Sequence, residues 1–287
     1  MASFKDVLRK VLPLRTSVFA SARAEIAQEL DHIKKGIAHS NRQSESLANR
    51  ISVLEAEEKL TRNTAKELLW AETFNRSISD VSWLKGVSFS PGRWAVGYPF
   101  LYVLFRVLST FKPQNIFELG LGESSKMIAS YAAGESDVRH CVVEDDANWI
   151  DFFKTSAAGV NFNNTEIVRL DLEMIDHPAS TAPVRSYLGF AESFAQKKFD
   201  LISIDGPIGA DMHDIARIDI LELLPGCLED SFIIMIDDSN RSGEAKMISQ
   251  VVEKLRQAKI ETVTGIYQGE KELTLICSPD NAFYCTL

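Results

Sequence analysis

Residues 115–125 read NIFELGLGESS, and this stretch decides the fold. Apolar residues before Gly120 form a short strand, and a helix begins after Gly122. Glycine allows a sharp turn and a close approach to the backbone, and the first amides of the helix then face a ligand. The stretch therefore predicts a strand, a glycine turn and a helix around a nucleotide-type ligand.

Strands and helices alternate on both sides of this turn. A helix is expected over 98–110, and further helices over 124–133, 148–157 and 243–258. One more helix is expected to end near Leu224. Strands are expected over 115–120, 140–145, 165–171, 199–205, 231–237, 260–267 and 272–278. Such alternation predicts a parallel sheet covered on both faces. Because the link QGEK before the last strand is too short for a crossover helix, that strand is expected to run antiparallel. The predicted fold class is α/β, with a Rossmann-like, mostly parallel sheet of seven strands.

A long helix is predicted ahead of this domain, because residues 21–60 contain no proline and no hydrophobic strand. Its apolar residues fit a heptad repeat in which Ser40 and Ser44 fill the intervening core positions: Ile26, Leu30, Ile33, Ile37, Leu47, Ile51 and Leu54. The pattern favours a coiled coil that joins copies of the chain or binds a partner. The alternative is a helix that folds back onto the domain that follows it. We expect a homo-oligomer.

Three regions are expected along the chain. Residues 1–20 form a short amphipathic segment that is suited either to an anionic membrane surface or to packing on the rest of the protein. Residues 21–85 form the helical oligomerisation region. Residues 86–287, which open on the helix-breaking text SFSPGRWAVG, form the ligand-binding domain.

Composition limits the function further. A net charge of -9, from 31 basic and 40 acidic residues, disfavours general binding to nucleic acid. The four cysteines form no CxxC pair, which is typical of buried, reduced thiols. With neither a secretory signal nor a long apolar run, the sequence predicts a cytoplasmic protein, with the inner membrane surface as an alternative site.

Carboxylates follow several of the predicted strands. Glu144 ends one strand, where it can accept hydrogen bonds from ribose hydroxyls, and Asp145 would lie beside an adenine. Asp171 ends the next strand and is a further candidate for the adenine end. The alternative is that these acids are ordinary solvated strand ends.

A second acidic group follows the later strands. Asp205 ends LISID, and Asp237 and Asp238 end IIMIDD on the neighbouring strand. Because adjacent carboxylates repel, their convergence suggests a bound hard cation such as Mg²⁺. In the alternative, Asp237 caps the next helix and Asp205 contacts a cofactor or solvent.

From about Pro99 to its end, the chain resembles class I methyltransferases that use S-adenosylmethionine (SAM). It is most similar to metal-dependent O-methyltransferases of the catechol and macrolide-sugar kinds, and to methyltransferase-like proteins of bacterial surface glycan synthesis. The resemblance implies a metal on Asp205, Asp237 and Asp238, and SAM with its ammonium near Glu118. The remaining residues implied at the cofactor are Gly120, Leu121, Gly122, Ser124, Ser125, Glu144, Asp145 and Asp171. A dinucleotide-binding oxidoreductase would require a third glycine near Ser125, and the sequence has none.

The sequence departs from these relatives at the catalytic base. Their aspartate or lysine, two or three residues after the first metal ligand, is replaced here by Pro207 and Ile208. His213 is the candidate base in its place, with Asp211 or Asp214 to orient it. Asp205 is a second catalytic candidate.

The expected function is SAM-dependent methylation of a sugar hydroxyl, in a polysaccharide or a glycosylated metabolite, with divalent-metal assistance. Trp94 and Tyr98 are candidates for a sugar-stacking surface or for core packing. The alternative function is an interaction protein in which a non-catalytic Rossmann-like domain accompanies the coiled coil. Binding of SAM distinguishes the two.

Overall fold

The computed structural model describes residues 4–157, 159–212 and 214–287, with side chains from residue 17 onward. The chain divides into two compact units, residues 1–61 and 62–287. His213 and the apolar side chains of the predicted amphipathic segment up to residue 16 lie outside this description.

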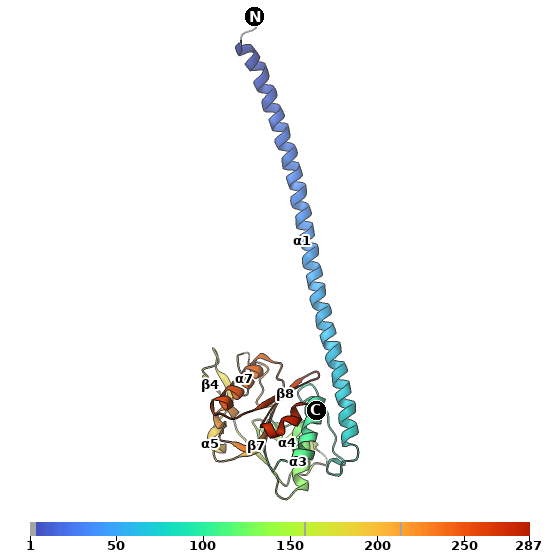
Figure 1. Cartoon of the computed structure of the whole chain (residues 1–287), viewed down its shortest axis with the longest axis vertical. Helices are drawn as coiled ribbons and strands as arrows, with labels where there is room; N and C mark the ends of the chain where they lie inside the picture. Colours follow the sequence, from blue (N-terminus) through green and yellow to red (C-terminus); the bar gives the residue numbers. More distant parts are fainter. Residues whose placement is uncertain (1–3, 158, 213) are drawn as a thin grey trace. The chain divides into compact units, whose positions relative to one another are not determined.

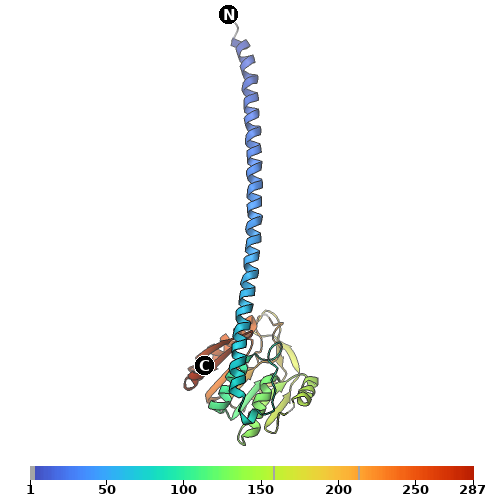
Figure 2. The ribbon, with the colours of Figure 1, turned by 90° about the vertical axis from the view of Figure 1, so that its right-hand side faces the viewer.

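The predicted long helix is present as α1, Phe4–Ile78, and it is unbroken (Figures 1 and 2). Its last turns belong to the second unit, where Phe74 is buried and Trp70 packs against Tyr102 and Tyr267. Among the described residues, no helix has both the length and the apolar character needed to cross a bilayer.

The second unit is built on a seven-stranded sheet with the order β3-β2-β1-β6-β7-β9-β8. Only β9 runs antiparallel to its neighbours, as its short link to β8 predicts. The strands are β1 Asn115–Leu119, β2 Arg139–Glu144, β3 Thr165–Arg169, β6 Phe199–Ile204, β7 Leu228–Ile236, β8 Val263–Gln268 and β9 Glu272–Cys277. The predicted α/β class with a mostly parallel Rossmann-like sheet is confirmed.

Two apolar layers cover the sheet because alternate residues of each strand point to opposite faces. In β7, Ile234 and Ile236 join one layer, whereas Ile233 and Met235 join the other. The first layer contains α5 Phe190–Phe194, α6 Ile220–Leu223 and α7 Ser242–Gln257. The second contains α2 Tyr98–Arg106, α3 Glu123–Gly134 and the end of α1, with η1 Ser82–Leu84, η2 Val107–Phe111 and η3 Pro279–Cys285 beside them. Helix α4, Ala147–Ser156, packs over β2 and β3.

The stretch between β3 and β6 contains more structure than the sequence predicts. Strands β4, Leu172–Ile175, and β5, Val184–Tyr187, form a separate antiparallel pair. The side chains of β4 are only half-buried or exposed. Its sequence therefore lacks the strong apolar alternation by which a strand is predicted. The helix expected to end near Leu224 is reduced to the short α6.

Candidate active site

The glycine turn after β1 lies directly against the end of β6. Gly120 has a φ of 92°, and a Cβ built on it would stand 2.9 Å from the backbone nitrogen of Gly206. The backbone nitrogen of Asp205 donates to the carbonyl of Leu119 at 2.9 Å. The glycine turn and Asp205 are therefore neighbours at the carboxyl edge of the sheet.

The start of α3 forms an open cradle. A Cβ built on Gly122 would meet no heavy atom within 4 Å, apart from its own helix and chain neighbours. Ser125 accepts from the backbone nitrogen of Gly122 at 2.9 Å, so it caps the helix from inside the first turn. Ser124 is buried beside it. The remaining first-turn amides are the groups that bind an anion at a helix start.

Glu118 is fully buried, and among the described residues only one of its two carboxylate oxygens has a hydrogen-bond partner. Its Oε2 lies 3.0 Å from Nε2 of His140, whose Nδ1 is 3.1 Å from the hydroxyl of Thr165. Among the described residues, its Oε1 has no hydrogen-bond partner. An unsatisfied buried acceptor costs about 1–3 kcal/mol, which an ammonium donor would recover. The sequence reasoning missed His140, although a histidine inside an apolar strand is a visible signal.

Glu144 holds the glycine turn in place. Its Oε2 accepts from the nitrogen of Leu121 at 3.0 Å, and its Oε1 accepts from the nitrogens of Asp145 and Asp146 at 2.9 and 3.0 Å. Burial raises the pKa of Glu144, and these amide donors oppose the rise. The indole nitrogen of Trp149 donates to the carbonyl of Leu121 at 2.7 Å, a contact that the sequence did not predict. Both backbone groups of Leu121 are thus fixed by side chains.

The other two acids of the predicted cofactor set differ in their surroundings. Asp145 is half-buried beside Glu144, and burial raises its pKa. Asp171 is exposed and pairs with Arg169 at 2.5 Å. None of the described contacts joins Asp171 to the glycine turn.

Glu144→Gln is expected to weaken binding of S-adenosylhomocysteine (SAH), the demethylated product of SAM, at least tenfold. An amide side chain cannot accept from all three backbone nitrogens, so the turn loses part of its support, at a cost of about 1–3 kcal/mol. Calorimetric titration measures the change. The control is Glu173→Gln, an exposed residue of β4. Equal affinities in the two variants would contradict the role given to Glu144.

Two glycine substitutions separate folding from binding. Gly120→Ala is expected to destabilise the protein by about 1–3 kcal/mol, because alanine disfavours positive φ and its Cβ would also strike Gly206. Gly122→Ala is expected to leave the unfolding midpoint unchanged, since its Cβ has room, but to weaken SAH binding by filling the cradle. Denaturant titration and calorimetry check both. Full SAH affinity in Gly122→Ala would show that the ligand does not use this space.

The predicted acidic cluster exists, and basic side chains of the protein already engage it. Oxygens of Asp205, Asp237 and Asp238 all lie within 4.8 Å of one another. Nη2 of Arg217 is 3.1 Å from both Asp205 Oδ1 and Asp238 Oδ2. Nζ of Lys271 is 3.2 Å from Asp237 Oδ2 and 3.5 Å from Asp238 Oδ1. One guanidinium and one ammonium therefore bridge the acids as a divalent cation would.

Two further charged residues belong to this cluster. Arg241 lies 2.8 Å from Asp238, and Glu244 is buried 3.7 Å from both Arg217 and Arg241. Burial raises the pKa of Asp237 to about 8, and the nearby negative charge of Asp205 adds to this rise. Four acids of this cluster thus lie among three basic side chains. In the structure, the oxygens that would bind a metal ion are engaged by these internal cations.

The candidate base His213 lies outside the described residues, and its two proposed partners are engaged elsewhere. Asp211 pairs with Arg185 at 2.8 Å, and Asp214 accepts from Thr181 at 2.6 and 2.8 Å. Asp205, with its side chain 16% exposed, is the most accessible of the three clustered acids.

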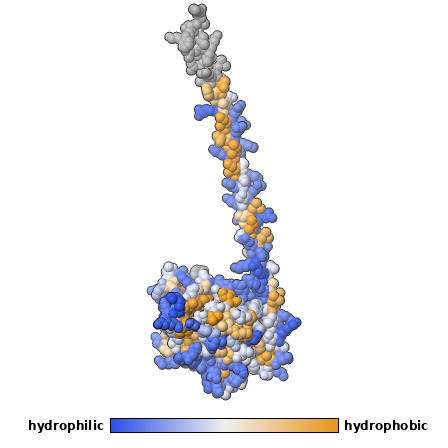
Figure 3. Space-filling view, viewed as in Figure 1, coloured by the Kyte–Doolittle hydropathy of each residue, from blue (hydrophilic) through white to orange (hydrophobic). Residues whose placement is uncertain are grey.

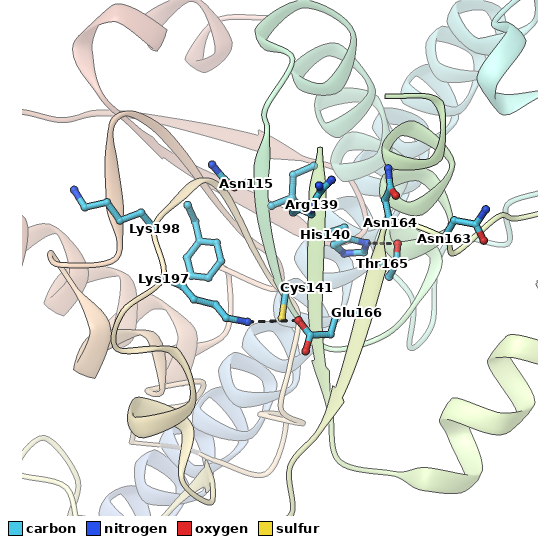
Figure 4. A pocket seen from close by; sticks show the side chains of 12 residues that line it. Asn115, Arg139, His140, Cys141, Asn163, Asn164, Thr165, Glu166, Lys197 and Lys198 are labelled. Atoms are coloured by element: carbon cyan, nitrogen blue, oxygen red, sulfur yellow. Dashed lines mark hydrogen bonds and ion pairs between the residues drawn. The ribbon is translucent and has the colours of Figure 1, made fainter. Parts of the chain in front are cut away.

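A separate pocket opens at the opposite edge of the sheet (Figure 4). It is lined by residues at the amino ends of the strands, among them Asn115, His140 and Thr165. Lys197 points across it to Glu166 at 3.5 Å. Because parallel strands carry their ligands at the carboxyl edge, this pocket is not the predicted site.

No protein-family model and no curated protein matches the chain. The solved structures that it resembles include O-methyltransferases. The enzyme from Bacillus cereus, in complex with SAH, is 16% identical over 74% of this chain and 90% of that one, with a TM-score of 0.43. TomG from Streptomyces achromogenes, involved in tomaymycin synthesis and solved with SAM, is 13% identical over 76% of this chain and 98% of that one, with a TM-score of 0.46. These similarities are too remote to assign an activity, which has to come from the site.

Proposed function

We propose that the protein is a SAM-dependent O-methyltransferase that acts on a sugar hydroxyl of a polysaccharide or a glycosylated metabolite. The observation that carries the proposal is the position of Asp205, a partly exposed acid beside the glycine turn that leads to the open cradle at Gly122. A cofactor subsite and a proton acceptor thus lie together at the carboxyl edge of β1 and β6.

The residues of the cradle fit the parts of SAM. The amides at the start of α3 suit its carboxylate, and the unpaired Oε1 of Glu118 suits its ammonium. Glu144 retains capacity for one more hydrogen bond, since a carboxylate can accept about four, and Asp145 lies beside it for the ribose and adenine end. When bound, SAM supplies an electrophilic sulfonium methyl group.

Asp205 has the properties of a general base for this reaction. Burial raises its pKa, which strengthens it as a proton acceptor, and the guanidinium of Arg217 holds one of its oxygens. It would accept the proton of the acceptor hydroxyl as that oxygen bonds to the methyl carbon, while the bond between this carbon and the sulfonium sulfur breaks and SAH leaves. His213 is the other candidate for this step. No step is assigned to Mg²⁺, because Arg217 and Lys271 occupy its place.

An exposed aromatic residue supports a sugar as the acceptor. Trp94 is 82% exposed, in a loop whose Ser90 nitrogen donates to Glu123 at 2.8 Å, in the first turn of α3. An exposed indole face in this loop is suited to stacking on a sugar ring. The proposal is tested by transfer of labelled methyl groups from SAM to a panel of sugar and phenolic acceptors. Transfer to phenols alone would refute the sugar assignment while retaining the methyltransferase.

The N-terminal helix has a second role in this proposal. Residues 21–85 serve to assemble copies of the chain, and residues 86–287 carry catalysis. The cytoplasmic location and the membrane contact of residues 1–20 stay predictions. An interaction protein without catalysis is the competing function, favoured by the exposed apolar stripe of α1, and the absence of SAM binding would select it.

A further inference from the structure

The apolar residues of α1 form one exposed stripe. The side chains at the heptad core positions are between 50% and 60% exposed: Ile26, Leu30, Ile33, Ile37, Leu47, Ile51 and Leu54. Figure 3 shows apolar groups recurring along the helix between hydrophilic ones. An apolar stripe of this length on a single helix is typical of a surface that another helix covers.

We infer that two copies of the chain pair through this stripe as a parallel, in-register coiled coil; the inference deepens the self-association proposed above. In the heptad abcdefg, Leu30, Ile37, Ser44 and Ile51 take position a. Position d is taken by Ile26, Ile33, Ser40, Leu47 and Leu54. Isoleucine at a between leucines at d, as in residues 47–54, favours two strands, whereas Leu30 at a between isoleucines at d favours more. The mass in solution, described below, distinguishes the two.

The charged residues that flank the stripe select the parallel orientation. In a parallel pair, each g residue meets the e residue of the next heptad on the other helix. Glu29 at g then meets Lys34 at e, and Arg50 at g meets Glu55 at e. All four side chains are exposed along α1. Each of these pairs joins opposite charges, and each occurs twice in the dimer.

An antiparallel pair of helices can also bring the apolar residues of the two stripes together, but it lacks these pairs of opposite charges. It places Ser40 opposite Ser44 and Ile37 opposite Leu47, so its core is equally apolar. Position g now meets position g, which brings Glu29 opposite Glu57, two like charges. The flanking charges therefore decide between two orientations that the core alone leaves equal.

Disulfide cross-linking of the full chain tests the orientation. In the parallel pair, Ser44 faces its own copy, so Ser44→Cys is expected to give a covalent dimer on mild oxidation. Ser46→Cys is the control, because position c points away from the partner, and Cys285→Ser serves as the background since Cys285 is the one native cysteine that is not buried. A cross-link that forms only between Ser40→Cys and Ser44→Cys chains would overturn the parallel arrangement.

The mass in solution tests the pairing itself. The wild type is expected at twice 32.0 kDa by light scattering, and Ile51→Glu at 32.0 kDa at the same concentration. Val53→Glu is the matched control: Val53 is 57% exposed against 55% for Ile51, but it lies off the stripe, so its dimer is expected to persist. A monomeric or trimeric wild type would overturn the inference. Because these readouts need no nucleotide, they are independent of methyl transfer.

Discussion

Arg217→Met is expected to destabilise the protein by about 3–5 kcal/mol. The guanidinium is 3% exposed and lies between Asp205, Asp238 and Glu244, so its loss leaves buried acids without their central cation. Methionine retains much of the side-chain length, and the change is therefore mainly one of charge. Urea titration of both proteins measures the difference in the free energy of unfolding.

Arg256→Met is the matched control for this prediction. Arg256 also pairs with an acid, Glu253 at 2.8 Å, but its side chain is 72% exposed. Exposed pairs contribute about 0–1 kcal/mol, so this variant is expected to unfold close to the wild type. If both variants unfold alike, Arg217 is not what holds the acidic cluster together.

Asp205→Asn is expected to lower the rate of methyl transfer by about 10²–10⁴-fold, the usual contribution of a general base. An asparagine amide has nearly the same shape and still accepts a hydrogen bond from Arg217, but it cannot take up a proton. Single-turnover rates with saturating SAM measure the chemical step. SAH affinity is expected to change little, because the cradle lies on the neighbouring turn.

Asp151→Asn, on the exposed side of α4, is the control for a general charge effect. It removes one negative charge from the same domain without entering the site. An unchanged rate in Asp205→Asn would transfer the role of base to His213. A joint loss of rate and SAH affinity would instead make Asp205 a cofactor residue.

The sheet was predictable because its central strands are buried on both faces. Largely apolar runs such as LISI at 201–204 and IIMI at 233–236 are typical of parallel strands, and the acids that follow them mark the carboxyl edge. Asp205, Asp237 and Asp238 were therefore expected to converge, and they do.

The partners of these acids were harder to predict. Lys271 lies in the turn before β9, and since β9 runs antiparallel to β7, the start of β9 meets the end of β7. That signal was present in the sequence. Arg217 lies in an irregular loop with a φ of 55°, so its place depends on a chain path that periodicity does not predict. The sequence reasoning anticipated neither cation beside the acids.

Titration of the wild-type protein with SAH, in EDTA and again with Mg²⁺, tests the central claim most directly. The residues at Gly122, Glu118 and Glu144 predict specific binding of one SAH per chain, with the same affinity in both buffers. The absence of binding would contradict the methyltransferase and favour the interaction protein. Binding that requires Mg²⁺ would show that a metal ion displaces Arg217 or Lys271 from the acids.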